Sequence, residues 1–182
     1  MAVEELTGIG LGLDYGTMRL DRTPQLWLEA GAELRGEVAE LLGTAAASVE
    51  HVGSSAVLGL LAKPILDLAV GSADDRDLAV VKNRLETAGW IYRGDAGDDD
   101  GGHVFVLEGR PWHRVAHIHV VRHGGAPWRN YVRCRDLLRR SSEARDQYEA
   151  VKLELFTIHG SDRKAYTADK AAIVNSLLDQ CP

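Results

Sequence analysis

Several features that would assign a protein to a specialised class are missing from this sequence of 182 residues. It has only two cysteines, Cys134 and Cys181, which lie in no metal-like spacing and are expected to be reduced thiols in a cytoplasm. It contains no apolar run of about 18 residues or more, and its first residues lack the basic, apolar and small-residue pattern of a signal peptide. These absences predict a cytoplasmic protein that does not enter a membrane.

A general excess of positive charge is also missing, because the net charge is −6. This balance argues against general nucleic-acid binding. The charge is uneven, however: residues 110–145 hold nine arginines and only two acidic side chains. Arginine grips anions with a planar fork of donors, so this segment is either a functional basic face or a reflection of genome composition.

Apolar residues make up 45% of the chain, which is enough for a full core, and the length fits one domain over residues 1–182. Hydrophobic periodicity and Gly and Pro signals predict the elements. The predicted strands are 17–20, 48–52, 65–70, 90–93, 103–107 and 115–121. The predicted helices are 24–42 with Thr23 as N-cap, 77–88, 127–140, 143–159 and 166–178, and 94–102 is a loop. We therefore expect an α/β (α+β) fold, a mixed β-sheet with packed helices and a C-terminal helical segment.

The most informative segment joins two predicted strands through a turn of small residues. Such a turn lets backbone N–H groups approach a phosphate, and serine hydroxyls add further donors. A lysine shortly after the turn supplies positive charge. The predicted phosphate-binding residues here are Gly53, Ser54, Ser55 and Lys63.

Asp67 lies within the apolar strand that follows this turn. A buried carboxylate is costly unless it is paired or bound to a metal. Asp67 is therefore predicted to hold a divalent cation against the phosphates. The alternative is that Gly53 only serves the turn and Asp67 caps a segment or forms a salt bridge.

These residues resemble the signature of the GrpB family, which belongs to the nucleotidyltransferase-fold superfamily. The resemblance extends over residues 12–178 and rests on these pieces: Glu50-His51-Val52-Gly53-Ser54-Ser55, Lys63-Pro64-Ile65-Leu66-Asp67, Arg114-Val115-Ala116-His117-Ile118-His119-Val120, Trp128, Arg135-Asp136-Leu137-Leu138-Arg139, Tyr148, Lys152 and Lys170. It implies a nucleotidyltransferase-like sheet. In that superfamily a Gly-Ser turn and two carboxylates one residue apart hold Mg²⁺ against a nucleoside triphosphate, whose α-phosphorus an acceptor hydroxyl attacks.

The sequence departs from the superfamily pattern at the second carboxylate, where it has Ala69, and the GrpB pattern shares this departure. One carboxylate holds Mg²⁺ poorly unless phosphates or other side chains complete the octahedron. Two-metal catalysis of the usual kind is therefore not expected.

His117 and His119 are candidates for the missing ligands, because residues two apart on a strand point the same way. Paired imidazoles suit a transition metal or a proton relay better than Mg²⁺; the alternative is a satisfied core histidine beside an incidental one. We expect a ring nitrogen of His119 about 3–4 Å from the Asp67 carboxylate. Glu50 is predicted to be the polar partner of Lys63 or Arg114.

Four basic residues, Arg114, Arg135, Lys152 and Lys170, are predicted to bind anionic groups. The expected function is transfer of a nucleotidyl or phosphoryl group from a nucleoside triphosphate such as ATP to a small-molecule acceptor, with Mg²⁺ or Mn²⁺ as cofactor. The resemblance and the missing carboxylate also allow a non-catalytic nucleotide- or CoA-related binding module. A weaker alternative is a metal-dependent hydrolase.

Overall fold

The computed structural model describes residues 2–73, 75–95 and 102–159. Lys170, the predicted helix 166–178 and most of the predicted loop 94–102 lie outside these residues. The elements, in chain order, are α1 (Val3–Gly8), β1 (Leu13–Asp14), β2 (Asp21–Arg22), α2 (Gln25–Leu42), η1 (Gly43–Ala45), β3 (Ser48–Val52), η2 (Ser54–Ala56), β4 (Leu61–Ala62), β5 (Leu66–Ser72), α3 (Asp75–Thr87), β6 (Ile91–Asp95), β7 (His103–Arg110), β8 (His113–Arg122), α4 (Ala126–Arg140) and α5 (Ser142–His159).

The main sheet is mixed, as predicted, with strand order β3-β5-β8-β7-β6. The two central strands β5 and β8 run parallel, and the other neighbours pair antiparallel. The short β1 pairs with the first residues of β8, just before β5 begins to pair with that strand. A second, two-stranded sheet is formed by β2 and β4. The parallel pair β5–β8 sets side by side the two strands that carry the predicted metal ligands.

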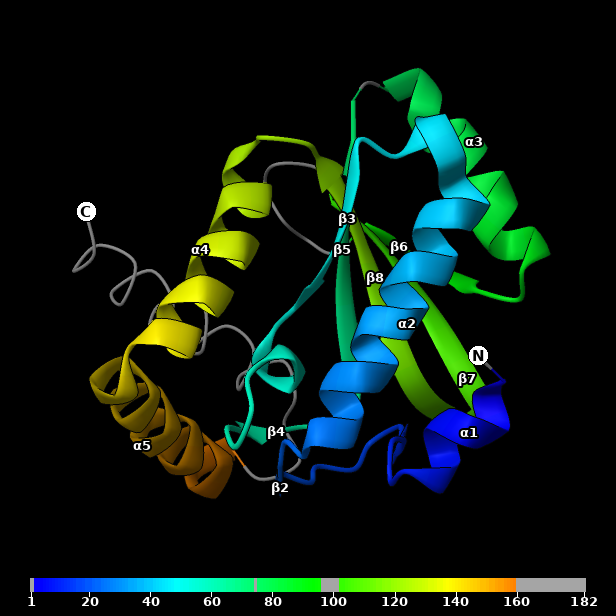
Figure 1. Cartoon of the computed structure of the whole chain (residues 1–182). Helices are drawn as coiled ribbons and strands as arrows, with labels where there is room; N and C mark the ends of the chain where they lie inside the picture. The colour runs from blue at the N-terminus through cyan, green and yellow to red at the C-terminus, as the bar shows by residue number, and fades with distance from the viewer. Residues whose placement is uncertain (1, 74, 96–101, 160–182) are drawn as a thin grey trace.

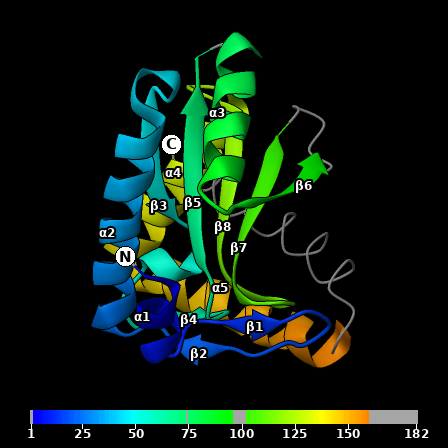
Figure 2. The ribbon, with the colours of Figure 1, turned by 90° about the vertical axis from the view of Figure 1, so that its right-hand side faces the viewer.

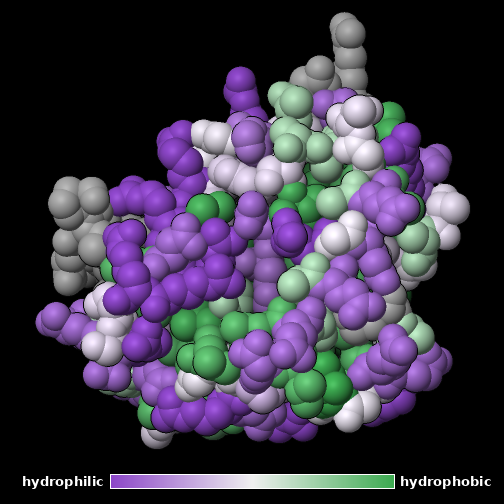
Figure 3. All heavy atoms as spheres, viewed as in Figure 1, coloured by the Kyte–Doolittle hydropathy of each residue, from purple (hydrophilic) through white to green (hydrophobic). Residues whose placement is uncertain are grey.

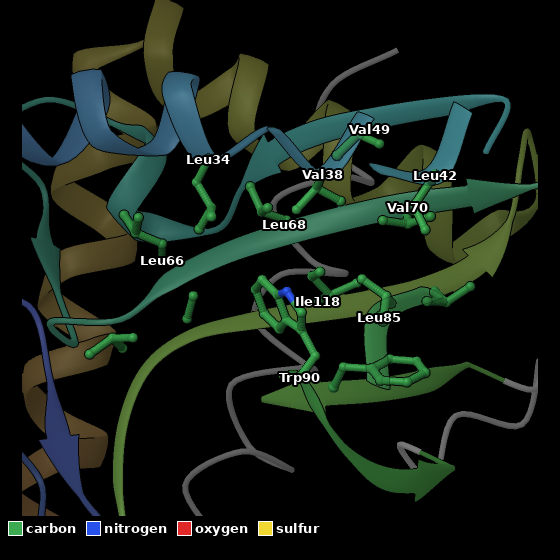
Figure 4. Packing of buried hydrophobic residues seen from close by; sticks show 14 of the residues in the cluster. Leu34, Val38, Leu42, Val49, Leu66, Leu68, Val70, Leu85, Trp90 and Ile118 are labelled. Carbon is green, nitrogen blue, oxygen red and sulfur yellow. The ribbon is translucent and has the colours of Figure 1, made fainter. Parts of the chain in front are cut away.

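Helices cover both faces of the main sheet (Figures 1 and 2): α2 and α3 lie on one face, and α4 lies on the other with α5 following it. The larger core lies on the first face, where α2 residues pack on β3, β5 and β8 (Figure 4). A smaller cluster lies on the second face and consists of Val52, Ala69, Val121 and Trp128. Trp128 is thus a core residue. Because β5 is covered on both faces, its sequence is a nearly continuous apolar run.

The predicted strands and helices between Ser48 and His159 recur with boundaries shifted by a few residues at most. The start of the chain differs more. Residues 17–20 form no strand, and the helix Val3–Gly8 was not predicted. This helix is only six residues long, and it docks through Leu6, which is fully buried. Short helices owe their stability to tertiary packing rather than to local propensity, so the sequence alone gave no signal for it.

The start of α2 also differs from the prediction. Pro24 is the N-cap and Thr23 makes no capping bond. Instead, the Thr23 hydroxyl donates to the Leu60 carbonyl at 2.9 Å, which ties this helix start to the segment before β4. Within the described residues, no helix has both the length and the apolar character needed to cross a membrane.

Candidate functional site

Asp67, His117 and His119 come together on the α4 side of the two central strands. In the β5–β8 register, Asp67 lies beside His117 and Ala69 beside His119. Asp67 Oδ1 is 3.2 Å from His117 Nδ1 and 3.8 Å from His119 Nε2. The potential ligand atoms of all three side chains lie within 4.8 Å of one another. The separation expected between His119 and Asp67 is therefore found.

The electrostatics of this cluster favour an ionised carboxylate beside a neutral imidazole. Burial by itself raises the pKa of Asp67, but hydrogen bonds from His117 and His119 outweigh it and hold that pKa well below its ordinary value. Burial lowers the pKa of His117, although the contact with Asp67 opposes this. Metal ligation requires this pair of protonation states, because carboxylate and imidazole must both have lost their protons.

The cluster is not sealed from solvent. The side chains of Asp67, His117 and His119 are 32%, 18% and 22% exposed. His119 is also incompletely satisfied, because its Nδ1 is buried without a hydrogen-bond partner among the described residues. A core histidine in a structural role would have its ring nitrogens bonded. His119 therefore does not have the bonding expected of a satisfied core histidine.

Gly53 brings the turn after β3 directly against Asp67. Its φ is +71°, and a β-carbon at this position would lie 2.8 Å from Asp67 Oδ2. Only glycine combines this left-handed backbone with so close an approach. Asp67 thus has one carboxylate oxygen facing the histidines and the other facing the turn.

The two serines of the turn point to different partners. Ser54 Oγ accepts a hydrogen bond from Lys152 Nζ at 2.8 Å and lies 3.2 Å from the Tyr148 hydroxyl. Tyr148 and Lys152 share one face of α5, as their spacing predicts. Ser55 Oγ instead lies 3.3 Å from His51 Nε2 on the α2 side of the sheet. The Ser55 side chain is therefore directed away from the Asp67 cluster, which its prediction as a phosphate donor did not anticipate.

Glu50 pairs with Arg135 and not with the predicted Lys63 or Arg114. Arg135 Nη1 donates to Glu50 Oε2 at 2.7 Å, and Arg135 Nε donates to Asp136. Burial opposes the charge of Arg135, but the hydrogen bonds that it donates to these carboxylates raise its pKa. The prediction was wrong because Glu50 faces α4, whose position along the sheet only the tertiary packing fixes. Arg135 thus holds two carboxylates in this structure.

Lys63 and Arg114 lie near the start of β5 and β8. Lys63 is half-buried between β4 and β5, four residues before Asp67. Arg114 is buried, its guanidinium carbon lies 4.5 Å from the centre of the Tyr15 ring, and its charge contributes to lowering the pKa of His117. Arg114 thus supplies positive potential at the cluster.

Two aromatic residues of this region were not predicted. The Tyr131 ring on α4 lies 5.3 Å from the His119 ring, centre to centre, and Tyr15 underlies Arg114. The recurrence of Trp128, Tyr131 and Arg135 at helical spacing was an available signal for Tyr131. Tyr15 carried no such signal, because it lies in a short irregular segment. Beyond these contacts, exposed arginines make the outer face of α4 hydrophilic (Figure 3).

Comparisons with known proteins agree on one family and one fold. The family profile described as GrpB protein matches residues 17–180. A UPF0157 protein of Deinococcus radiodurans is 34% identical over 74% of this chain and 67% of its own length. The glutamate-rich protein GrpB of Alkalihalophilus pseudofirmus is 27% identical over 93% of this chain and 99% of its own length.

Two solved structures share the fold. The crystal structure of the conserved protein GrpB from Enterococcus faecalis has a TM-score of 0.74 at 22% identity, covering 89% of this chain and 98% of that one. The structure of Cid1, a nucleotidyltransferase, in complex with its short product ApU has a TM-score of 0.52 at 12% identity, covering 72% of this chain and 41% of that one. The nucleotidyltransferase-like sheet implied by the sequence is therefore confirmed as the fold.

Proposed function

The chain belongs to the GrpB family, and from this premise we propose that it transfers a nucleotidyl or phosphoryl group from a nucleoside triphosphate to a small-molecule acceptor. One observation carries the proposal: Asp67, His117 and His119 meet beside the Gly53 turn on a sheet whose fold a nucleotidyltransferase shares. That neighbour is described with a dinucleotide product, which supports a nucleotide as the substrate class. Nucleoside triphosphates are cytoplasmic metabolites, so we assign the activity to the cytoplasm.

In the proposed reaction the triphosphate lies along the Gly53 turn, next to the outer oxygen of Asp67. Arg114 supplies positive potential beside His117, and Lys63 adds charge near the start of β5. Stabilisation of developing negative charge by such fixed groups is the main contribution to phosphoryl transfer. The acceptor hydroxyl oxygen forms a bond to the attacked phosphorus and releases its proton to water. The bond from that phosphorus to the leaving phosphate oxygen breaks, and pyrophosphate or a nucleoside diphosphate departs.

The residues present fit one divalent metal ion. Asp67 with His119 and His117 would hold it, and the ion would neutralise charge on the phosphates. They do not fit a second ion at the usual position, because Ala69 is fully buried against Val52 and Trp128. This apolar position is the specific observation that favours the rival function, a binding module that retains the nucleotide without turning it over.

The test is to incubate the full chain with each nucleoside triphosphate, labelled at the α- or γ-phosphorus, with Mg²⁺ or Mn²⁺ and a low-molecular-mass extract as acceptor source. Transfer of the α-label with pyrophosphate release indicates nucleotidyl transfer, and transfer of the γ-label indicates phosphoryl transfer. Asp67→Asn should abolish either. The control His113→Asn alters a histidine of β8, the strand that also carries His117 and His119. His113 contacts a different aspartate, Asp14, so this variant should retain activity.

Thermal unfolding distinguishes the remaining outcomes. A nucleotide at about 100 times its Kd stabilises the fold by about 2.7 kcal/mol. Stabilisation without any transfer would establish the binding module instead. Phosphate release to water from non-nucleotide esters alone would point to a metal-dependent hydrolase. Neither stabilisation nor transfer with any triphosphate would refute both nucleotide-based functions.

A further inference from the structure

The side chains of the Asp67 cluster differ in kind from those of a magnesium site. Mg²⁺ takes oxygen ligands in near-ideal octahedral geometry and is bound through carboxylates, waters and substrate phosphates. Here one carboxylate is joined by two imidazoles, and imidazole suits Zn²⁺, Fe²⁺, Ni²⁺ and Cu²⁺. Resting on the proposed function but narrowing its cofactor, we infer that Asp67, His117 and His119 form a site for a single first-row transition-metal ion and do not select Mg²⁺.

The spacing of the three side chains matches one ion. Ligand bonds of about 2.0–2.2 Å set neighbouring ligand atoms about 3–3.5 Å apart around a metal. Asp67 Oδ1 is 3.2 Å from His117 Nδ1, within that range, and 3.8 Å from His119 Nε2, slightly beyond it. The ligand atoms of the three side chains, the two imidazoles included, lie within 4.8 Å of one another. Rotation of the histidine side chains toward Asp67 would bring the set to ligand spacing.

The three ligands approach from one side only. Asp67 and both histidines come from adjacent strands of one sheet, so they occupy neighbouring coordination positions. The positions on the opposite side remain open to water or to phosphate oxygens. Asp67 Oδ2 meanwhile faces the Gly53 turn. A phosphate held by this turn would therefore reach the open side of the ion, which links the metal site to the proposed substrate.

The site admits one ion and no second. The neighbouring strand position is the methyl group of Ala69, packed against Val52, Val121 and Trp128. Within the described parts of the chain, no other set of three histidine, cysteine or acidic side chains has metal-binding spacing. The buried Nδ1 of His119, without a partner in the same residues, also distinguishes the cluster from a closed structural network.

The test measures metal binding without nucleotide or turnover. Full-length protein without a polyhistidine tag is stripped with a chelator and titrated by calorimetry with Mg²⁺, Mn²⁺, Co²⁺ and Zn²⁺, and with Co²⁺ by visible absorption. We expect one ion per chain, a visible Co²⁺ band, and affinity rising from Mg²⁺ through Mn²⁺ to Co²⁺. Asp67→Asn, His117→Ala and His119→Ala should each lower Co²⁺ affinity at least about tenfold, whereas His113→Ala should leave it unchanged.

The variants are first compared with the parent protein by circular dichroism and chemical unfolding, and His119→Asn replaces any variant that does not fold. Mg²⁺ affinity equal to that of Co²⁺, two bound ions, or unchanged affinity in the variants would overturn the inference. A single tightly bound transition metal without any nucleotide transfer would refute the proposed function and leave the metal site standing. Nucleotide transfer supported by Mg²⁺, without any Co²⁺ binding, would support the proposed function and refute the transition-metal site.

Discussion

At the scale of single residues, Asp67 shows how a carboxylate stays ionised within an apolar strand. Burial alone would raise its pKa, yet the hydrogen bonds from His117 and His119 lower it. The same burial lowers the pKa of His117, so the pair is held as a carboxylate next to a neutral ring. The proposed cation binding would therefore need no release of a proton from Asp67.

Gly53 allows a prediction about the close approach of the turn to Asp67. Gly53 has φ +71° and ψ −172°, a backbone region that is essentially restricted to glycine. Gly53→Ala should therefore lower the free energy of unfolding by more than the about 1–3 kcal/mol that such a strained backbone costs. The additional loss arises because the new methyl group, 2.8 Å from Asp67 Oδ2, must displace the carboxylate. Co²⁺ affinity should fall as well. Chemical unfolding and Co²⁺ titration measure the two effects.

The matched control is Gly59→Ala. Gly59 shares the positive φ, +75° against +71° for Gly53, but a β-carbon there would meet nothing within 4 Å. It should therefore show the backbone strain alone and retain metal binding. Equal losses of stability and of metal affinity in the two variants would mean that the contact between Gly53 and Asp67 has no role in shaping the site.

At the scale of elements, helix α2 rests on strand β3 through the contact of Gly31 with the His51 ring. Gly31 is buried within the helix, and an ideal β-carbon there would lie 2.2 Å from the ring of His51. The ring itself faces α2 because β3 alternates sides, which sends Glu50 and Val52 toward α4. The glycine thus sets how closely the helix approaches the sheet.

Gly31→Ala should reverse the usual effect of such a substitution in a helix. Alanine normally stabilises a helix interior by about 1 kcal/mol relative to glycine. Here the overlap with His51 should instead lower the free energy of unfolding by about 1–3 kcal/mol, the typical cost of overpacking a core. Gly36→Ala in the same helix meets nothing within 4 Å and should be stabilising. Urea unfolding measures the stability of both variants. An increase in the free energy of unfolding for Gly31→Ala as well as for Gly36→Ala would contradict the prediction.

Helix α5 is attached to the site by polar contacts with a two-residue strand. The Leu61 carbonyl accepts from Lys152 Nζ at 2.6 Å, and the Leu61 N–H donates to Glu149 at 2.8 Å. Lys152 also bonds Ser54 in the turn. One helix face therefore contacts both β4 and the turn. The C-terminal part of the described chain thus positions residues that lie 88 to 98 places earlier in the sequence.

At the scale of the whole molecule, stability depends on the protonation of the buried His51. Burial lowers its pKa from 6.5 to about 4, even though Asp67 opposes the shift. Between these values the unfolded chain binds a proton that the folded protein does not. The free energy of unfolding is therefore highest above 6.5 and decreases as pH falls through this window.

His51→Gln should remove this part of the acid sensitivity. The parent protein should lose about 2 kcal/mol more than the variant between about pH 7.5 and about pH 5. His117 and the carboxylates contribute to both proteins and cancel in the difference. Urea unfolding at each pH measures it, and an NMR titration of the His51 ring checks the pKa itself. Parallel stability curves, or a ring that titrates near 6.5, would contradict the prediction.

The local patterns of the sequence determined the elements and the chemistry they carry. Alternation and helical spacing depend on neighbours a few residues apart, so β3, β5, β8 and the long helices were predictable, as was the shared face of His117 and His119. The family resemblance added the sheet type. Ala69 already indicated that a second metal position is absent.

Only the tertiary structure decided which side chains meet. The parallel register of β5 and β8 sets Asp67 beside His117. The docking of α4 on the sheet allows Arg135 to form its ion pair with Glu50. The turn after β3 directs the side chains of Ser54 and Ser55 to opposite sides of the sheet. These contacts join residues dozens of positions apart, and their geometry follows from how whole helices and strands pack. No local pattern encodes it, which is why the shared face of His117 and His119 was predictable while the partner of Glu50 was not.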